Sequence, residues 1–136
     1  MTAAEQFFDT KVVLYLLSAD EVKANRAEAL LARGGVLSVQ VLNECVAVAS
    51  RKLRMPWNEI GDVLSQVRAV CSVVPVTIET HDGAMRIAHR YRLSISDALI
   101  VSAALGSGCR TLYSEDLQDG QVIDRQLTIR NPFRAP

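Results

Sequence analysis

Short apolar runs alternate with longer amphipathic segments along the whole chain. The apolar runs are typical of buried strands and occupy residues 6–8, 36–39, 71–76, 110–113 and 127–129. The intervening segments place apolar residues at helical spacing and predict helices over residues 12–17, 20–32, 41–53, 57–70, 80–91 and 96–105. This alternation of strand and helix predicts an α/β fold with right-handed crossovers and a parallel sheet.

Local signals indicate where several of these elements begin and end. Asp20 is suited to cap the second helix, and Gly34 with Gly35 is expected to stop it. Pro75 places the third strand at an edge of the sheet or ends it. Ser96 is interpreted as the N-cap of the most apolar helix, so that Asp97 falls in its first turn.

The composition fits this class and limits the possible partners. The 136 residues predict one domain, 1–136, and 49% of them are hydrophobic, as expected for helices packed on a buried sheet. Lys and Arg number 15 and so do Asp and Glu, so no global field attracts a polyanion and any nucleic-acid binding has to be local.

Cysteine usage and hydropathy bear on the compartment. Cys45, Cys71 and Cys109 are far apart and lie in apolar runs, which favours reduced, buried thiols in a cytoplasmic protein. No apolar stretch approaches the roughly 20 residues that span a bilayer, so we expect no membrane association.

Four carboxylates carry the candidate chemistry. Asp9, Glu44, Asp97 and Asp116 each follow a predicted strand or open a predicted helix. Carboxyl ends of parallel strands meet at one edge of an open sheet, where several acids repel one another unless a cation neutralises them. We therefore predict a metal site that binds Mg²⁺ or Mn²⁺.

Each acid also has a plain structural interpretation. Asp9 and Asp97 are suited to capping helices, and Glu44 to a solvated helix face. Asp116 is suited to starting a turn over residues 116–120. The metal interpretation rests on the joint placement of the four side chains.

The sequence around these acids resembles the PIN domain, especially the small prokaryotic VapC-like toxins. The residues that carry the resemblance are Phe7-Phe8-Asp9-Thr10, Ser38-Val39-Gln40-Val41-Leu42-Asn43-Glu44, Ser96-Asp97-Ala98-Leu99-Ile100-Val101-Ser102-Ala103-Ala104 and Leu112-Tyr113-Ser114-Glu115-Asp116-Leu117. They occur in the family's order and span nearly the whole chain.

This resemblance implies a fold and an activity. The fold would be a three-layer α/β/α sandwich with a central, mainly parallel sheet. The activity would be a metal-dependent endoribonuclease, often a homodimer that a cognate antitoxin neutralises. Asp9, Glu44, Asp97 and Asp116 would be the catalytic and metal-binding acids, with Ser114 as the family's hydroxyl residue. Glu115 is a possible substitute for the fourth acid.

Lys11 departs from the family pattern. It stands two residues after Asp9, where the family commonly has a small polar residue such as Asn. Its ammonium group could pair with the acids and weaken metal binding, or its long stem could carry the charge to a phosphate.

Two basic clusters are candidates for contact with RNA. Arg51, Lys52 and Arg54 form the first, and Arg86, His89, Arg90 and Arg92 form the second. Solvated helix faces or helix caps are the structural alternative for both.

We therefore expect a toxin that hydrolyses single-stranded or looped RNA. The first alternative is a catalytically impaired PIN module that binds RNA or a protein, with Lys11 disturbing the metal site. The second is a phosphohydrolase or a receiver domain. It is disfavoured because the sequence lacks the Asp-x-Asp nucleophile of the first class and the combination of doubled acid and Lys placement of the second.

Overall fold

A six-stranded sheet forms the centre of the computed structural model, which describes residues 5–134. The strand order is β3-β2-β1-β4-β6-β5, and every neighbouring pair is parallel except β5 with β6. The strands are β1 (Gln6–Phe8), β2 (Gly35–Ser38), β3 (Cys71–Val74), β4 (Thr111–Tyr113), β5 (Val122–Ile123) and β6 (Leu127–Arg130). The predicted α/β class with a mainly parallel sheet is thereby confirmed.

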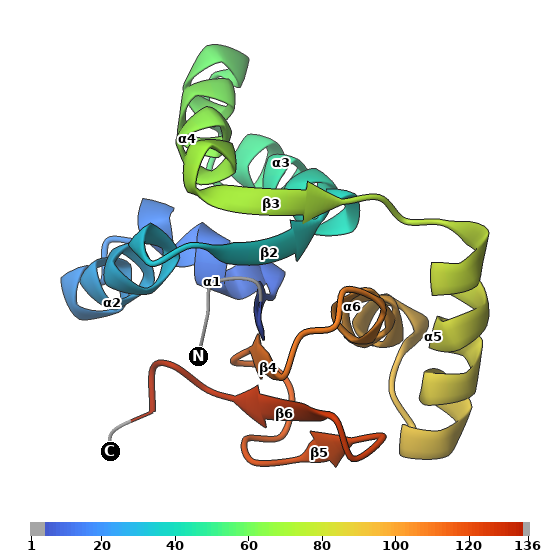
Figure 1. Ribbon diagram of the computed structural model, residues 1–136. Coiled ribbons are helices and arrows are strands. Elements are labelled where there is room, and N and C mark those ends of the chain that lie inside the picture. Colours follow the sequence, from blue (N-terminus) through green and yellow to red (C-terminus); the bar gives the residue numbers. More distant parts are fainter. Residues whose placement is uncertain (1–4, 135–136) are drawn as a thin grey trace.

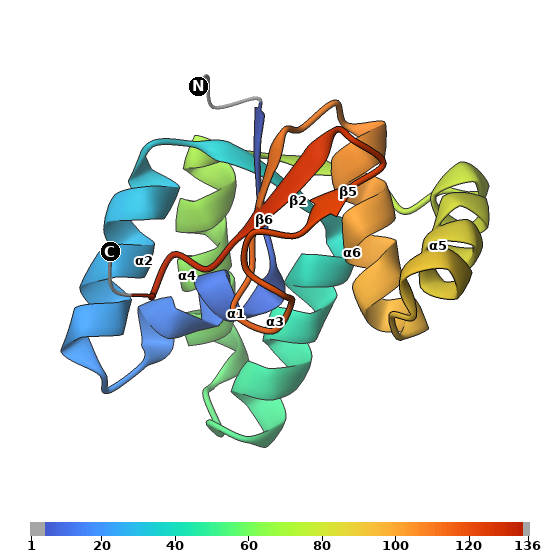
Figure 2. The same ribbon diagram turned by 90° about the horizontal axis from the view of Figure 1, so that it is seen from below.

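Helices cover both faces of this sheet. They are α1 (Thr10–Leu14), the 3₁₀ turn η2 (Tyr15–Leu17), α2 (Glu21–Ala32), α3 (Val39–Arg51), α4 (Trp57–Val70), α5 (Ile78–Tyr91) and α6 (Ile95–Gly106). Figures 1 and 2 show α1 to α4 on one side of the sheet and α6 on the other, with α5 packed against α6. The three-layer arrangement is the one that right-handed crossovers produce.

The central strands and α6 hold the core. Phe7, Phe8, Leu37, Leu112 and Ile129 are fully buried on the strands. Helix α6 buries residues on nearly all its faces, as its apolar sequence predicted. All three cysteines are free and buried, as expected.

Several predicted boundaries were wrong by a few residues. Helix α6 is capped by Ser94, whose Oγ accepts from the N–H of Asp97, and Ser96 lies inside the helix. Asp97 nevertheless stays in the first turn. The second strand ends at Ser38, whose hydroxyl caps α3, and the third ends at Val74, directly before Pro75 at the sheet edge.

Two further differences concern capping and pairing. Helix α5 starts earlier than predicted, because Thr77 is its N-cap and Thr80 completes a reciprocal capping box. Strand β5 was not predicted, since two residues that pair antiparallel with β6 give no usable periodicity. Within residues 5–134, no helix combines the length and hydrophobicity needed to cross a membrane.

Candidate active site at the carboxyl edge of the sheet

Asp9 is the most deeply placed of the four predicted acids. It follows β1 directly, caps α1 and is only 5% exposed. One carboxylate oxygen accepts from the N–H of Thr10 at 2.7 Å, and the other accepts from the Ser114 hydroxyl at 2.7 Å. The pKa of Asp9 is raised to about 6, mainly by burial, with the two hydrogen bonds opposing the increase and the charges of Asp116 and Asp97 adding to it.

Glu44 reaches the same edge from the second turn of α3. The Thr10 hydroxyl donates to its Oε1, so Thr10 connects Glu44 to Asp9 through its hydroxyl and its backbone N–H. Gln40, one turn earlier on α3, donates to Glu44 Oε2 at 3.0 Å and to the carbonyl of Ser96 at 3.0 Å. These bonds tie the amino-terminal ends of α3 and α6 together.

Asp97 lies half-buried in the first turn of α6. Burial raises its pKa, and the charges of Asp116 and Glu44 add to that increase, whereas the hydrogen bond with Ser94 opposes it. The charge of Asp116 thus acts on both Asp9 and Asp97, and Glu44 acts on Asp97. Thr10 links Glu44 to Asp9 through hydrogen bonds.

Asp116 is the most exposed of the four and is held by Lys11. The Lys11 ammonium lies 2.8 Å from Asp116 Oδ1, and this hydrogen bond is the main reason why the pKa of Lys11 is raised. Of the two possibilities for Lys11, pairing with an acid is the one that the structure shows, and Asp116 is the partner.

Glu115 points to a different set of partners. Its carboxylate accepts from the Tyr15 hydroxyl and from the Lys23 ammonium, the latter at 2.8 Å. Burial raises the pKa of Glu115, but the hydrogen bonds from Lys23 and Tyr15 outweigh burial and lower it overall. Glu115 is therefore engaged beside α2, next to the four acids but not among those that act on Asp9 and Asp97.

The donor chemistry of this edge fits a hard divalent cation. The candidate ligands at this edge are carboxylate oxygens. The pKa of Asp9 is raised by burial and by repulsion from neighbouring acids, and a bound cation would relieve that repulsion. Gln40 Oε1, next to Glu44, is a buried oxygen without a hydrogen-bond partner among the described residues. Within residues 5–134, no group of three or more Asp, Glu, His or Cys side chains is placed so that it could hold a metal ion, and Asp116 is paired with Lys11.

The remaining predicted site residues lie apart from the acids or beneath them. Ser114 is fully buried; its Oγ donates to Asp9 and accepts from the N–H groups of Asp116 and Leu117. Ser114, at the position of the family's hydroxyl residue, therefore orients Asp9 through this hydrogen bond. Arg51, Lys52 and Arg54 are exposed at the carboxyl end of α3.

Two residues that hold the site were not assigned a role from the sequence. Thr10 follows Asp9 directly, and Gln40 precedes Glu44 by one helical turn. The i, i+4 spacing of Gln40 and Glu44 is a signal that could have identified this pair. The role of Thr10 depends on α3 packing beside α1, which local sequence does not reveal.

A buried carboxylate edge of this kind, on a mainly parallel sheet between two helical layers, defines an α/β protein with an acidic centre. The chain belongs to the PIN domain family, which residues 7–119 match. No curated protein sequence matches the chain.

Solved structures share this fold at low sequence identity. The VapC20 toxin of Mycobacterium tuberculosis, described as cleaving the sarcin-ricin loop, is 22% identical with a TM-score of 0.66; the match covers 82% of this chain and 89% of that chain. A toxin–antitoxin complex from Klebsiella pneumoniae is 16% identical, with a TM-score of 0.70 and coverages of 93% and 97%. VapBC2 of Rickettsia felis, bound to a DNA fragment from its promoter, is 16% identical, with a TM-score of 0.67 and the same coverages.

Proposed function

We propose that this PIN domain protein is an endoribonuclease that uses Mg²⁺ or Mn²⁺ to hydrolyse phosphodiester bonds of single-stranded or looped RNA. The observation that carries the proposal is the grouping of the acids at one edge of the sheet: Thr10 bridges Asp9 and Glu44, and the charge of Asp116 acts on both Asp9 and Asp97. A phosphodiester is an anion, so four carboxylates at the site of its cleavage require a cation between them and the substrate.

The four acids have different parts in this proposal. Asp9 is fixed by Thr10 and Ser114 and would serve as the immobile ligand, with Asp97 beside it. Glu44 and Asp116 are held by neutral donors and by Lys11, respectively, and would complete the metal site or accept a proton from water. When bound, the cation supplies positive charge that activates water and offsets the charge developing on the phosphate.

Ser114 and Thr10 act as positioning residues for these acids. Both donate hydrogen bonds to carboxylates, so both favour the charged forms that bind a cation. Arg51, Lys52 and Arg54 are proposed to contact the phosphates of the RNA at the carboxyl end of α3.

The likeness to toxin–antitoxin complexes supports a matching biological role. Complexes from Klebsiella pneumoniae and Rickettsia felis contain chains of this fold, and the match extends over 97% of each. We propose that this protein is the toxin of such a pair, acts in the cytoplasm as a homodimer and is neutralised by a cognate antitoxin protein.

Calorimetric titration with Mn²⁺ and Mg²⁺, combined with cleavage of a mixed RNA pool, tests the nuclease proposal. The wild type should bind metal saturably and cleave RNA, and chelator should abolish cleavage. Asp97→Asn should lose both, since it removes a coupled charge while Ser94 still caps the helix through the backbone of residue 97. Asp62→Asn, the same change on the exposed face of α4, is the matched control and should behave as the wild type.

The ion pair between Lys11 and Asp116 specifically favours a second candidate function. At 2.8 Å, Lys11 already supplies a positive charge to one of the four acids. In this second function the protein is a catalytically impaired module that binds RNA or a protein partner. Absence of metal binding at millimolar concentration, with an intact fold, would favour it over the nuclease.

A further inference from the structure

A cleft of about 670 Å³ lies away from the four acids, between α2 and the β4–β6 part of the sheet. Helix α2 forms one wall, and the segment after β6 closes one end through Pro132, whose carbonyl accepts from Arg26 Nε at 3.0 Å. Figures 1 and 2 show α2 and the carboxyl-terminal segment on the same side of β6. Apart from α2, the lining of the cleft comes from β4, β6 and the residues that flank them, so strand side chains form its floor.

Strand alternation makes that floor polar. Leu112 and Ile129 point to the opposite face and are fully buried. The cleft is lined instead by two cross-strand pairs, Thr111 with Thr128 and Tyr113 with Arg130. Two hydroxyl groups, a phenol and a guanidinium therefore face the space that α2 leaves open.

The charged residues that line the cleft are all positive. Arg26, Arg33, Arg110 and Arg130 line it, and no acidic residue does. This is a local excess of positive charge in a chain whose Lys and Arg total equals its Asp and Glu total. Because the net charge is zero, any nucleic-acid contact was expected to be local, and this cleft is a local concentration of positive charge.

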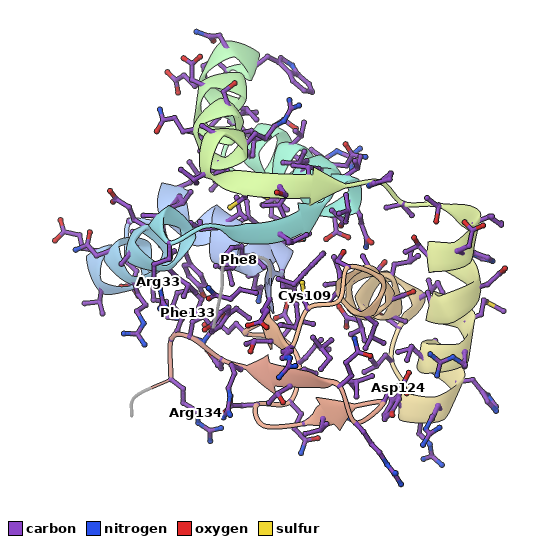
Figure 3. The ribbon with its side chains drawn as sticks, viewed as in Figure 1. Phe8, Arg33, Cys109, Asp124, Phe133 and Arg134 are labelled. Carbon is purple, nitrogen blue, oxygen red and sulfur yellow. The ribbon has the colours of Figure 1, made fainter. Side chains whose placement is uncertain are left out.

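Two of the four guanidinium groups are available for a ligand. Among the residues that the structure describes, neither the Arg33 nor the Arg130 side chain donates a hydrogen bond or forms an ion pair. Arg33 is labelled in Figure 3 at the end of α2, on the same side of the molecule as Phe133. Arg110 has a loose contact of 3.8 Å with Glu5 and remains 76% exposed.

We infer that this cleft binds the phosphodiester backbone of single-stranded RNA. Guanidinium groups match phosphate oxygens with paired N–H donors, and the threonine hydroxyls add donors without sequence preference. Tyr113 offers an aromatic ring at the same floor, on which a base can stack. The cleft thus combines phosphate donors with a stacking surface.

The position of the cleft connects it to the acidic edge. Tyr113 ends β4 in the cleft, and the next residue, Ser114, holds Asp9. The Arg26–Pro132 hydrogen bond closes the cleft at the carboxyl ends of these strands, so an RNA strand bound along the β4–β6 face would pass over this contact to reach the acids. This inference rests on the proposed function for its choice of RNA, whereas the anion site itself rests on the cleft alone.

The test is RNA binding measured in chelator, where no cleavage is expected. Fluorescence anisotropy of a labelled single-stranded RNA would be followed against salt for the wild type, Arg33→Gln and Arg33→Gln/Arg130→Gln. The single variant should bind roughly 3- to 10-fold more weakly, and its salt dependence should fall by about 0.7 in slope for the one lost phosphate contact. Arg68→Gln removes the same charge from the last turn of α4 and should leave binding unchanged.

Each outcome has a defined meaning. Equal affinity and equal salt slope for the wild type and the double variant would overturn the inference, whether or not the protein cleaves RNA. Arg33-dependent binding by a protein that proves unable to cleave would support the cleft and reject only the nuclease. If a poly-glutamate peptide required Arg33 and Arg130 but RNA did not, the cleft would belong to an acidic protein segment and the RNA inference would be wrong.

Discussion

At the scale of single residues, Lys11 pairs with Asp116, and both side chains are close to half exposed. In the proposed metal site, the Lys11 ammonium group would compete with the cation for Asp116. An exposed ion pair contributes no more than about 1 kcal/mol, so Lys11→Asn should raise Mn²⁺ affinity by up to about fivefold. Calorimetric titration of the purified variant measures this change directly.

Lys23 provides the matched control for that prediction. It forms an ion pair of the same 2.8 Å length with the adjacent Glu115, outside the group of coupled acids. Lys23→Gln should therefore change Mn²⁺ affinity less than Lys11→Asn does. Equal effects of the two variants would mean that general charge, rather than competition at Asp116, governs metal binding.

Two glycines illustrate how one Cβ atom can have opposite effects. A Cβ at Gly35 would lie 2.4 Å from Phe8 Cε2 and 2.9 Å from the carbonyl of Gln6, so β2 can approach β1 only without a side chain there. Gly35→Ala should destabilise the protein by roughly 1–3 kcal/mol, as overpacking does. At Gly61, inside α4, nothing lies within 4 Å, and Gly61→Ala should stabilise it by roughly 0.5–1 kcal/mol.

Urea denaturation of the two variants measures both signs in one experiment. The pair controls for the general effect of replacing glycine, which lowers the entropy of the unfolded chain in both cases. Stabilisation by Gly35→Ala would contradict the close approach of β1 and β2 at this position.

At the scale of elements, the β5–β6 hairpin is fastened to α5 through Asp124. Arg86 donates to Asp124 at 2.7 Å, Tyr91 donates to it at 3.1 Å, and the N–H of Asp124 donates back to the Tyr91 hydroxyl. The hydrogen bond from Arg86 is the main cause that lowers the pKa of Asp124; burial opposes it, and Tyr91 and the charge of Arg90 assist it. The charged carboxylate is therefore favoured in the folded state.

The pH dependence of stability follows from this sign. A lowered pKa in the folded state stabilises the protein above the usual Asp value of about 3.9, and the contribution is lost as pH falls through the lowered value. Asp124→Asn should reduce stability by roughly 0.5–1 kcal/mol at pH 6 and by clearly less at pH 3. Urea midpoints of the wild type and the variant at both pH values test this, and a difference that does not depend on pH would contradict it.

Element boundaries show where local sequence information ends. The long helices were predictable because their apolar periodicity persists over several turns, as in α3 and α4. The choice between Ser94 and Ser96 as the cap of α6 was not, since both hydroxyls precede the same apolar run. Strand β5 exists because β6 pairs with it, and a two-residue partner leaves no pattern of its own.

At the scale of the whole molecule, the part of the candidate site that follows from the order of strands and helices along the chain was predictable. The four acids were found because strand ends of a parallel sheet meet at one edge. The hydrogen bonds of Thr10 and the partner of Lys11 depend on packing between α1, α3 and the segment after β4, which no local pattern encodes. The arginine cleft was missed for the same reason, since its residues come from α2 and from two strands near the other end of the chain.

Electrostatic repulsion among the acids should also affect the free energy of unfolding of the whole protein. A cation that binds only the folded protein stabilises it by about 2.7 kcal/mol at one hundred times its Kd. Mn²⁺ should therefore raise the urea midpoint of the wild type, whereas Asp97→Asn should respond weakly. In chelator the order should reverse, with Asp97→Asn at least as stable as the wild type, because the change removes repulsion from Asp116 and Glu44. A variant that unfolds in chelator would instead assign Asp97 a structural role, and equal Mn²⁺ responses would place the metal elsewhere.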